Sequence, residues 1–199
     1  MTTTEAEPSA AGTLTIRPGH ALLLDQQQPG QYDCLQVEVG LVRVALSRPG
    51  QDALDARPVT LGFLQAGDHL PLDALRHDAR LHLQALTTTR LVAGCPAQPA
   101  IGASSLHDWT LELLLIRQRG EAEQRIVALL HLLVHRLGRR RGAWYELPLR
   151  LTHAELAELS GHTRATVTRQ FSRWRDHGLL QQDCGPERLL RIAPQLVHA

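Results

Sequence analysis

Arginines at helical spacing near the C-terminus are the residues whose type and spacing could do chemistry. Val167, Phe171 and Trp174 repeat at i, i+4 and i+7, which predicts an amphipathic helix. With residues placed at about 100° intervals, four lie opposite this stripe and three lie on one flank. The four are Ala165, Arg169, Ser172 and Arg173, and the flank holds Arg164, Thr168 and Arg175. A guanidinium suits phosphate oxygens and the O6/N7 edge of guanine, so this face favours binding in the major groove of double-stranded DNA.

A shorter helix before this one would complete a helix-turn-helix. Thr152 and Glu155 form a Thr-x-x-Glu capping box, in which hydroxyl and carboxylate each satisfy a backbone N–H at a helix start. Residues 160–162 supply the turn, since Gly161 can take a positive φ, and Thr163 is a candidate N-cap for the second helix. The alternative is an ordinary helical hairpin with a solvated charged face, because this spacing also occurs in bundles that bind nothing.

Short extended segments flank the two helices. Ala143–Leu149 is predicted as a strand that leads into the capping box. After the second helix, Leu179–Gln181 and Leu189–Ile192 flank a turn-forming cluster at 183–187. This pattern predicts a β-hairpin, and hence a winged helix-turn-helix.

The charge distribution separates the two halves of the 199-residue chain. The formal net charge is only +1, and all 21 basic residues are arginine. Residues 1–133 contain 10 Arg and 14 Asp or Glu, whereas residues 134–199 contain 11 Arg and 6 Asp or Glu. The balance therefore changes from −4 to +5, which is expected of a chain with one nucleic-acid-binding domain.

The N-terminal half has the period of β-strands. Seven apolar or alternating runs are separated mostly by Gly and Pro turns, which predicts an antiparallel β-sandwich or jelly roll. The runs are Leu14–Ile16, Ala21–Leu24, Cys34–Val39, Leu41–Leu46, Val59–Leu64, Arg80–Leu86 and Arg90–Val92. The predicted class is α+β: a disordered tail at 1–12, a β-roll at 13–103, a dimerisation helix at 104–120 and the winged helix-turn-helix at 121–199.

The predicted helix at 104–120 carries apolar residues on more than one side. Leu106, Trp109, Leu113 and Ile116 follow helical spacing and are the candidates for dimerisation. Leucines at 111, 114 and 115 add a second side. Apolar surface left over after packing on its own domain favours pairing with a second copy, while burial of both sides within one chain is the alternative.

The sequence from Leu151 to Arg169, LTHAELAELSGHTRATVTR, is similar to the pattern [IL]-[ST]-x-x-[ED]-[IL]-A-x-x-x-G-x-[ST]-R-E-T-V-x-R of the cyclic-AMP receptor protein/FNR (CRP/FNR) family of bacterial transcription regulators. The order of elements from about Leu14 onward also resembles that family, as do Gly40-Leu-Val-Arg-Val and Leu64-Gln-Ala-Gly-Asp. The resemblance implies a homodimer that binds palindromic DNA and acts with RNA polymerase.

Site residues follow from the resemblance, position by position. It implies base contacts by Arg164, Ala165 and Arg169, and phosphate contacts by Thr152, Thr163, Thr166, Ser172 and Arg173. Ala165 stands where the family usually has a glutamate that accepts from cytosine N4, and alanine cannot accept. The preferred half-site is therefore expected to differ at one base pair.

The expected effector site departs from the cyclic-nucleotide-binding pattern. Pro71-Leu72 replaces the Gly-Glu pair that would hold the ribose, and no Arg followed by a small residue holds a phosphate, so cyclic AMP is not expected. Three scattered cysteines cannot supply an iron–sulfur cluster and argue against a disulfide framework. A haem sensor stays open through His69, His77 and His82. A pocket for an anionic metabolite would use Arg76, His77 and Arg80, although a solvated loop explains them as well.

The remaining expectations concern location and chemistry. The cysteine count and the polar N-terminus favour a reducing cytoplasm, and no apolar run approaches the ~20 residues of a membrane span. A cupin-like binding protein or enzyme is the competing hypothesis, but the cupin His-x-His ligand pair is absent. We therefore expect no enzyme activity, no metal site and no cofactor.

Overall fold

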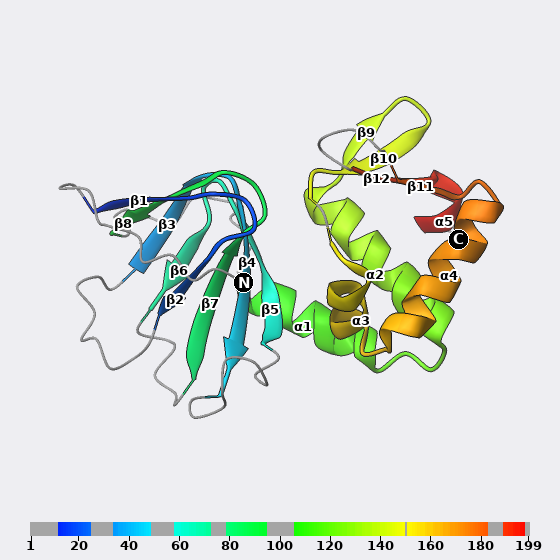
Figure 1. The fold of residues 1–199 in the computed structure, drawn as a ribbon, viewed down its shortest axis with the longest axis horizontal. Helices are drawn as coiled ribbons and strands as arrows, with labels where there is room; N and C mark the ends of the chain where they lie inside the picture. The colour runs from blue at the N-terminus through cyan, green and yellow to red at the C-terminus, as the bar shows by residue number, and fades with distance from the viewer. Residues whose placement is uncertain are drawn as a thin grey trace. The chain divides into compact units, whose positions relative to one another are not determined.

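The computed structural model describes residues 12–24, 34–48, 58–72, 79–94, 106–149, 151–182 and 189–197 of the chain. The chain divides into two compact units, Met1–Thr110 and Leu111–Ala199 (Figure 1). Strands form the first unit, and helices with a small sheet form the second. The predicted α+β class is therefore confirmed.

Two four-stranded antiparallel sheets make up the N-terminal unit, with strand orders β1-β8-β3-β6 and β2-β7-β4-β5. Their strands are β1 (Thr13–Ile16), β2 (Ala21–Leu24), β3 (Cys34–Val39), β4 (Leu41–Ser47), β5 (Val59–Gln65), β6 (His69–Pro71), β7 (Arg80–Ala85) and β8 (Thr89–Ala93). Seven of them overlap the predicted runs. Three-residue β6 was not predicted, because a segment so short shows no alternation.

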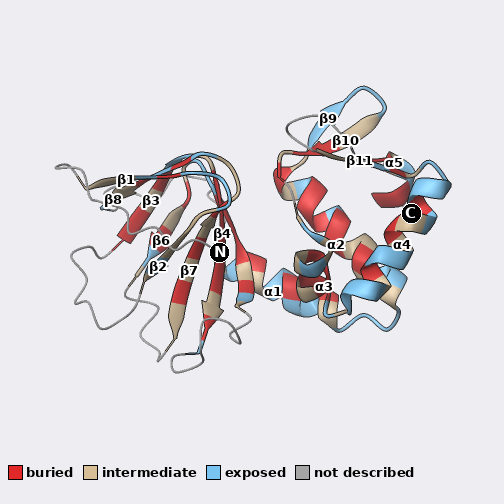
Figure 2. Cartoon of the chain, in the orientation of Figure 1, coloured by how far each residue is buried: buried red, intermediate tan, exposed pale blue. Residues whose placement is uncertain are grey.

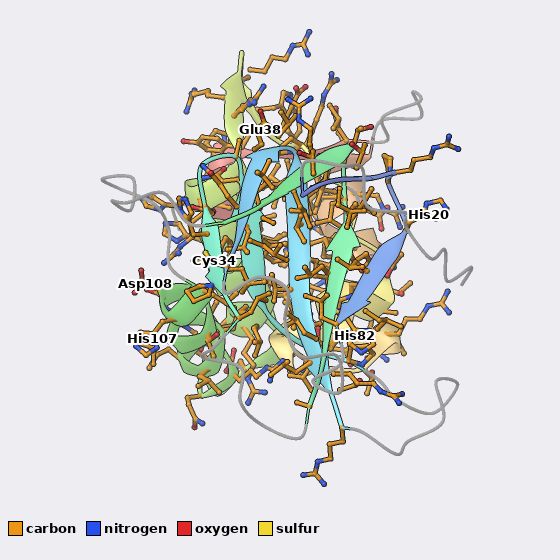
Figure 3. The ribbon with its side chains drawn as sticks, turned by 90° about the vertical axis from the view of Figure 1, so that its left-hand side faces the viewer. His20, Cys34, Glu38, His82, His107 and Asp108 are labelled. Carbon is orange, nitrogen blue, oxygen red and sulfur yellow. The ribbon has the colours of Figure 1, made fainter. Side chains whose placement is uncertain are left out.

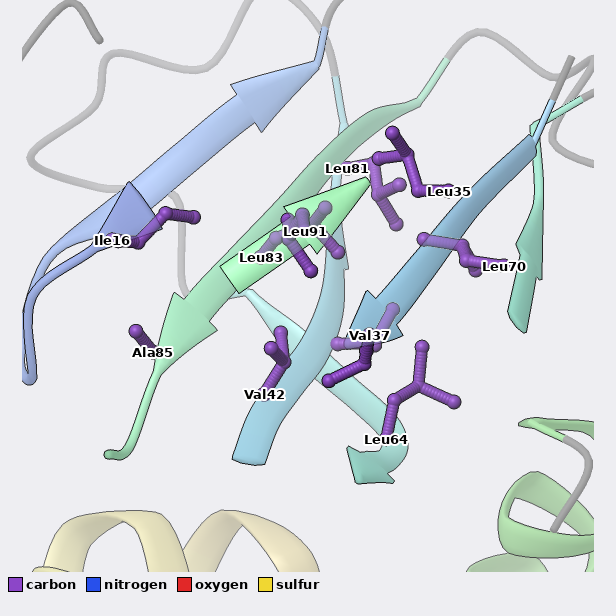
Figure 4. Packing of buried hydrophobic residues seen from close by; sticks show 11 residues of the cluster. Ile16, Leu35, Val37, Val42, Leu64, Leu70, Leu81, Leu83, Ala85 and Leu91 are labelled. Atoms are coloured by element: carbon purple, nitrogen blue, oxygen red, sulfur yellow. The ribbon is translucent and has the colours of Figure 1, made fainter. Parts of the chain in front are cut away.

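A buried cluster of described residues between the two sheets consists of Ile, Leu, Val and Ala side chains (Figure 4). Strand alternation explains this composition, since successive side chains point to opposite faces. In β4, Val42 and Val44 are fully buried in the core, while Arg43 between them points to the other face. Figure 2 shows the resulting runs of buried residues along the strands.

Cys34 corrects one expectation from the sequence. It begins β3, is buried and is disulfide-bonded (labelled in Figure 3). The sequence argued against a disulfide framework, but three cysteines still allow one disulfide. Cys95 and Cys184 lie outside the described residues. The cysteine count therefore no longer supports a reducing compartment.

Helix α1 (Leu106–Arg117) begins against β5 of the N-terminal unit. The Trp109 ring meets Phe63 edge to face at 5.1 Å, and the Thr110 hydroxyl donates to the Leu61 carbonyl at 3.0 Å. A Cβ on Gly62 would lie only 2.4 Å from the Trp109 Cβ. The glycine therefore lets this part of the helix approach the strand closely.

The C-terminal unit contains the predicted helices and hairpin. Its elements are α2 (Ala122–Leu137), β9 (Arg139–Arg141), β10 (Trp144–Leu147), α3 (His153–Ser160), α4 (Arg164–Asp176), β11 (Leu180–Gln182), β12 (Leu190–Ile192) and α5 (Pro194–Val197). The four strands form one antiparallel sheet in the order β11-β12-β10-β9. Strands β11 and β12 confirm the predicted hairpin, whereas β9 and α5 were not predicted.

Candidate nucleic-acid interface

The capping box at the start of α3 forms as predicted. The Thr152 hydroxyl accepts from the Glu155 N–H at 3.2 Å, and the Glu155 carboxylate accepts from the Thr152 N–H at 2.7 Å. The same carboxylate also accepts the Thr152 hydroxyl hydrogen at 2.9 Å. The start of the helix is therefore fixed at Thr152, and the hydroxyl hydrogen of Thr152 is donated to Glu155.

The turn between α3 and α4 also has the predicted geometry. Gly161 takes φ 70° and ψ 33°, the left-handed conformation that ends α3. Its N–H donates to the Glu158 carbonyl, and the His162 N–H donates to the Ala157 carbonyl. Thr163 then caps α4 by accepting from the Thr166 N–H at 3.2 Å. A tight helix-turn-helix results.

Helix α4 buries its apolar stripe and exposes its arginines. Val167, Phe171 and Trp174 are buried, as predicted. Ala165, Arg169 and Arg173 are exposed on the opposite side, and Ser172 is half-buried; Arg164, Thr168 and Arg175 on the flank are exposed as well (Figure 2). Arg164 and Arg169 form no ion pair among the described residues, so their charges face solvent.

Several of the predicted phosphate contacts are already engaged within the protein. The Thr163 and Thr166 hydroxyls lie 2.9 Å apart, so one donates to the other and one hydroxyl hydrogen remains available in either arrangement. Ser172 accepts from Arg175 Nη2 at 3.1 Å. Arg173 lies 3.9 Å from the Glu123 carboxylate in an exposed pair, which contributes little.

His153 joins the two helices and was not predicted. Its Nδ1 lies 2.9 Å from the Thr168 hydroxyl, and its ring meets Phe171 edge to face at 5.1 Å. Burial lowers the pKa of His153 from its ordinary value, and the nearby Arg175 and Arg164 guanidiniums lower it further. Both effects favour the neutral imidazole. No local pattern reveals a contact between residues 15 apart on two different helices.

Three of the four residues predicted for dimerisation are buried inside the chain. Trp109, Leu113 and Ile116 are each less than 5% exposed, and Leu106 is half-buried. The leucines of the second side are exposed instead: Leu111 at 46%, Leu114 at 51% and Leu115 at 64%. The apolar surface that α1 leaves available therefore consists of these three leucines.

The residues predicted for an effector pocket are only partly described. Arg76 and His77 lie outside the described residues, and Arg80 begins β7. His82, labelled in Figure 3, contacts the Ser47 hydroxyl at 2.7 Å. Arg43 beside it donates to Thr60 at 2.8 Å and to Gln84 at 3.0 Å. These polar side chains alternate with core residues and thus lie on the outer face of their sheet.

Two kinds of site are not found in the described part of the chain. No three His, Cys, Asp or Glu side chains there are grouped so that they could hold a metal ion. His69 has both ring nitrogens buried, and neither forms a hydrogen bond to a described residue. None of the described helices has the length and apolar character required to cross a membrane.

Known proteins resemble both the C-terminal domain and the whole fold. The family model of the Crp-like helix-turn-helix domain matches residues 124–193. The regulatory protein CysR of Synechococcus elongatus is 33% identical over 134 residues, a match that covers 62% of this chain and 62% of CysR.

Solved structures agree over nearly the full length. TTHA1359, a transcriptional regulator of the CRP/FNR family from Thermus thermophilus, has a TM-score of 0.65 at 21% identity and covers 94% of this chain and 98% of its own. FixK2 from Bradyrhizobium japonicum has a TM-score of 0.61 at 19% identity and covers 96% of each chain. At sequence identities of 21% and 19%, these matches show a shared fold only. Together with the match of residues 124–193, they bear out the predicted resemblance: the chain carries a Crp-like helix-turn-helix domain, and its fold is similar to that of CRP/FNR regulators.

Proposed function

We propose that the protein is a homodimeric, sequence-specific DNA-binding transcription regulator. The observation that carries this proposal is the outer face of α4, where Arg164 and Arg169 are exposed and unpaired among the described residues. Opposite them, the buried stripe fixes the orientation of the helix. Such a protein would bind double-stranded DNA at promoters and contact RNA polymerase.

The base contacts are assigned to Arg164 and Arg169, because an exposed guanidinium can donate two hydrogen bonds to the O6/N7 edge of guanine. Ala165 between them offers only a methyl group. The phosphate contacts favour Thr163 and Thr166, which have a hydroxyl hydrogen available, over Thr152, whose hydrogen is donated to Glu155. Contacts to the phosphate backbone of DNA set the register of the helix on the duplex.

The test is binding to a library of palindromic DNA sites at several salt concentrations. Wild-type protein should select a palindrome, and its affinity should fall as salt rises, because phosphate contacts release counterions. The Arg169→Ala variant should lose about 1–3 kcal/mol of discrimination between the selected site and random DNA. Arg139→Ala removes the same charge from exposed β9 and serves as the matched control.

Two results would contradict the assignment. An affinity independent of salt would remove DNA as the partner. Equal discrimination by the Arg169→Ala and Arg139→Ala variants would leave Arg169 without a role in sequence recognition.

Self-association through α1 completes the proposal, because two recognition helices are needed to bind two half-sites of a palindrome. Leu111, Leu114 and Leu115 supply an exposed apolar surface on one helix. Leu111→Glu combined with Leu115→Glu should shift the protein to monomer in sedimentation equilibrium, while Glu112→Gln on the same helix should not. An unchanged dimer in the double variant would place the two-fold contact elsewhere.

An effector other than a cyclic nucleotide fits the described core residues of the β-roll. A buried cluster of Ile, Leu, Val and Ala offers no donor for a ribose or a phosphate. This agrees with the Pro71-Leu72 replacement in the sequence.

A further inference from the structure

Arg117, the last residue of α1, holds the C-terminal end of α3. Its Nη2 donates to the Glu158 carbonyl at 2.9 Å and to the Glu158 carboxylate at 3.1 Å, and its Nε donates to the Leu159 carbonyl at 3.4 Å. The Arg117 and Glu158 side chains are only 28% and 23% exposed. Partial burial strengthens such charge-assisted hydrogen bonds relative to bonds at an open surface.

Helix α3 cannot supply this cation itself. It is eight residues long and has no basic residue in its last turn, although helix C-termini favour a positive charge. The Gly161 and His162 N–H groups satisfy two of its terminal carbonyls. Arg117 adds a guanidinium from another helix at the same place, so the end of α3 depends on the end of α1.

The contact lies where it can set the position of α4. A Cβ on Gly161 would meet Arg117 Cγ at 3.4 Å and Arg125 Nη1 at 3.8 Å, so the turn packs against two arginine side chains. Thr163, the N-cap of α4, follows two residues later. Any movement of Arg117 therefore acts on the turn that connects the two helices.

The same helix carries the surface assigned to self-association. Leu111, Leu114 and Leu115 precede Arg117 by two to six residues on α1 and are exposed. We propose that Arg117 is a positioning residue that links self-association through α1 to the placement of α3 and α4 for DNA. This proposal rests on the proposed function, but its first test requires neither a dimer nor DNA.

Four variants separate the contact from its alternatives. Arg117→Ala removes the contact with α3. Arg119→Ala, in the segment between α1 and α2, removes an exposed arginine and serves as the charge-matched control. Arg117→Lys keeps the charge, but one ammonium cannot reproduce a guanidinium fork, so its effect should be intermediate. Glu158→Gln should remain near wild type, because two of the three hydrogen bonds go to backbone carbonyls. The lysine and glutamine variants keep the test decisive if the alanine variant does not fold.

Amide hydrogen exchange of α3 in monomeric, DNA-free protein is the first measurement. The last turn of α3 should exchange about tenfold faster in Arg117→Ala than in Arg119→Ala, since hydrogen bonds from a charged donor are lost. Equal exchange in the two variants would overturn the proposal.

The second measurement repeats the exchange while protein concentration is raised through the range of self-association. In wild type, protection of α3 should rise with dimer formation, whereas in Arg117→Ala it should not. A contact that merely stabilises α3 would lower protection at every concentration and leave the rise intact, and that outcome would overturn the link.

DNA affinity gives the third measurement. Arg117→Ala should bind the selected palindrome about tenfold more weakly than Arg119→Ala, although both lose one positive charge. If wild type binds no palindrome, the proposed function fails, while the exchange comparison still decides the role of Arg117. If wild type binds and the two variants bind equally, the positioning role is refuted.

Discussion

Gly62→Ala should destabilise the N-terminal unit although it adds a single methyl group. The new Cβ would lie 2.4 Å from the Trp109 Cβ and 2.7 Å from its Cγ, against an optimal carbon–carbon separation of about 3.5–4.0 Å. Both atoms are close to the helix backbone, so a rotation of the ring cannot relieve the clash. The helix must move away from β5, which disturbs the Trp109–Phe63 contact and the hydrogen bond from Thr110 to Leu61.

The size of the loss follows from two opposing effects. Overpacking of a well-filled core costs roughly 1–3 kcal/mol, and a contact this short belongs at the upper end. Replacing glycine by alanine lowers the conformational entropy of the unfolded chain, which stabilises the folded state by about 0.4–1 kcal/mol. We expect a net loss of about 2 kcal/mol, which corresponds to roughly 30-fold faster exchange of amides that open with the unit.

Hydrogen exchange of β4 and β5 measures this loss in the N-terminal unit alone. Gly120→Ala is the matched control, because a Cβ there meets nothing within 4 Å. The reasoning is refuted if amides of β4 and β5 exchange at the same rate in both variants.

Three further predictions concern the cap, the recognition helix and pH. Thr152→Ala should cost about 1 kcal/mol in urea unfolding of the C-terminal unit, and Thr152→Ser should recover most of it, since serine keeps the capping hydroxyl. Ala165→Glu adds an acceptor for cytosine N4, so selection from a DNA library should show a new preference for cytosine at one position of each half-site. Burial lowers the pKa of His82 below its ordinary 6.5, and the Arg43 and Arg80 guanidiniums lower it further. As pH falls, the imidazole is therefore protonated in the unfolded chain before it is protonated in the folded protein. Its contribution to stability is therefore present above pH 6.5 and is lost as pH falls toward the folded pKa, and His82→Gln should flatten this dependence in unfolding at pH 7.5 and 5.5.

Local patterns were sufficient for the elements that bury one face. The stripe at Val167, Phe171 and Trp174 and the capping box at Thr152 depend only on residues within three or four positions, and both formed as expected. Strand β9 shows the limit of this reasoning. Three successive arginines have no β pattern, and their strand forms because Gly142 at φ 61° turns them back onto β10, where Arg140 lies over the Tyr145 ring at 5.3 Å.

The contacts that hold α3 and α4 could not be predicted, because they join residues distant in sequence. Arg117 reaches Glu158 across 41 positions, and His153 reaches Thr168 across 15. Each residue alone resembles a solvated surface side chain. Likewise, the helical period at 106–116 identified an apolar helix, but only packing decides that Trp109 faces inward and Leu115 outward.

The distribution of polar groups in the β-roll limits how the N-terminal unit can respond to a ligand. Between the sheets, the buried cluster is aliphatic, and a charged ligand placed there would lose its hydration without gaining a partner. On the outer face of sheet β2-β7-β4-β5, by contrast, Arg43 donates to Thr60 and to Gln84, and a separate hydrogen bond joins Ser47 to His82. Exposed Glu38 and Arg90 add polar groups on strands β3 and β8 of the other sheet. Substitutions of the aliphatic residues inside the roll should therefore change stability without changing the response to a polar ligand.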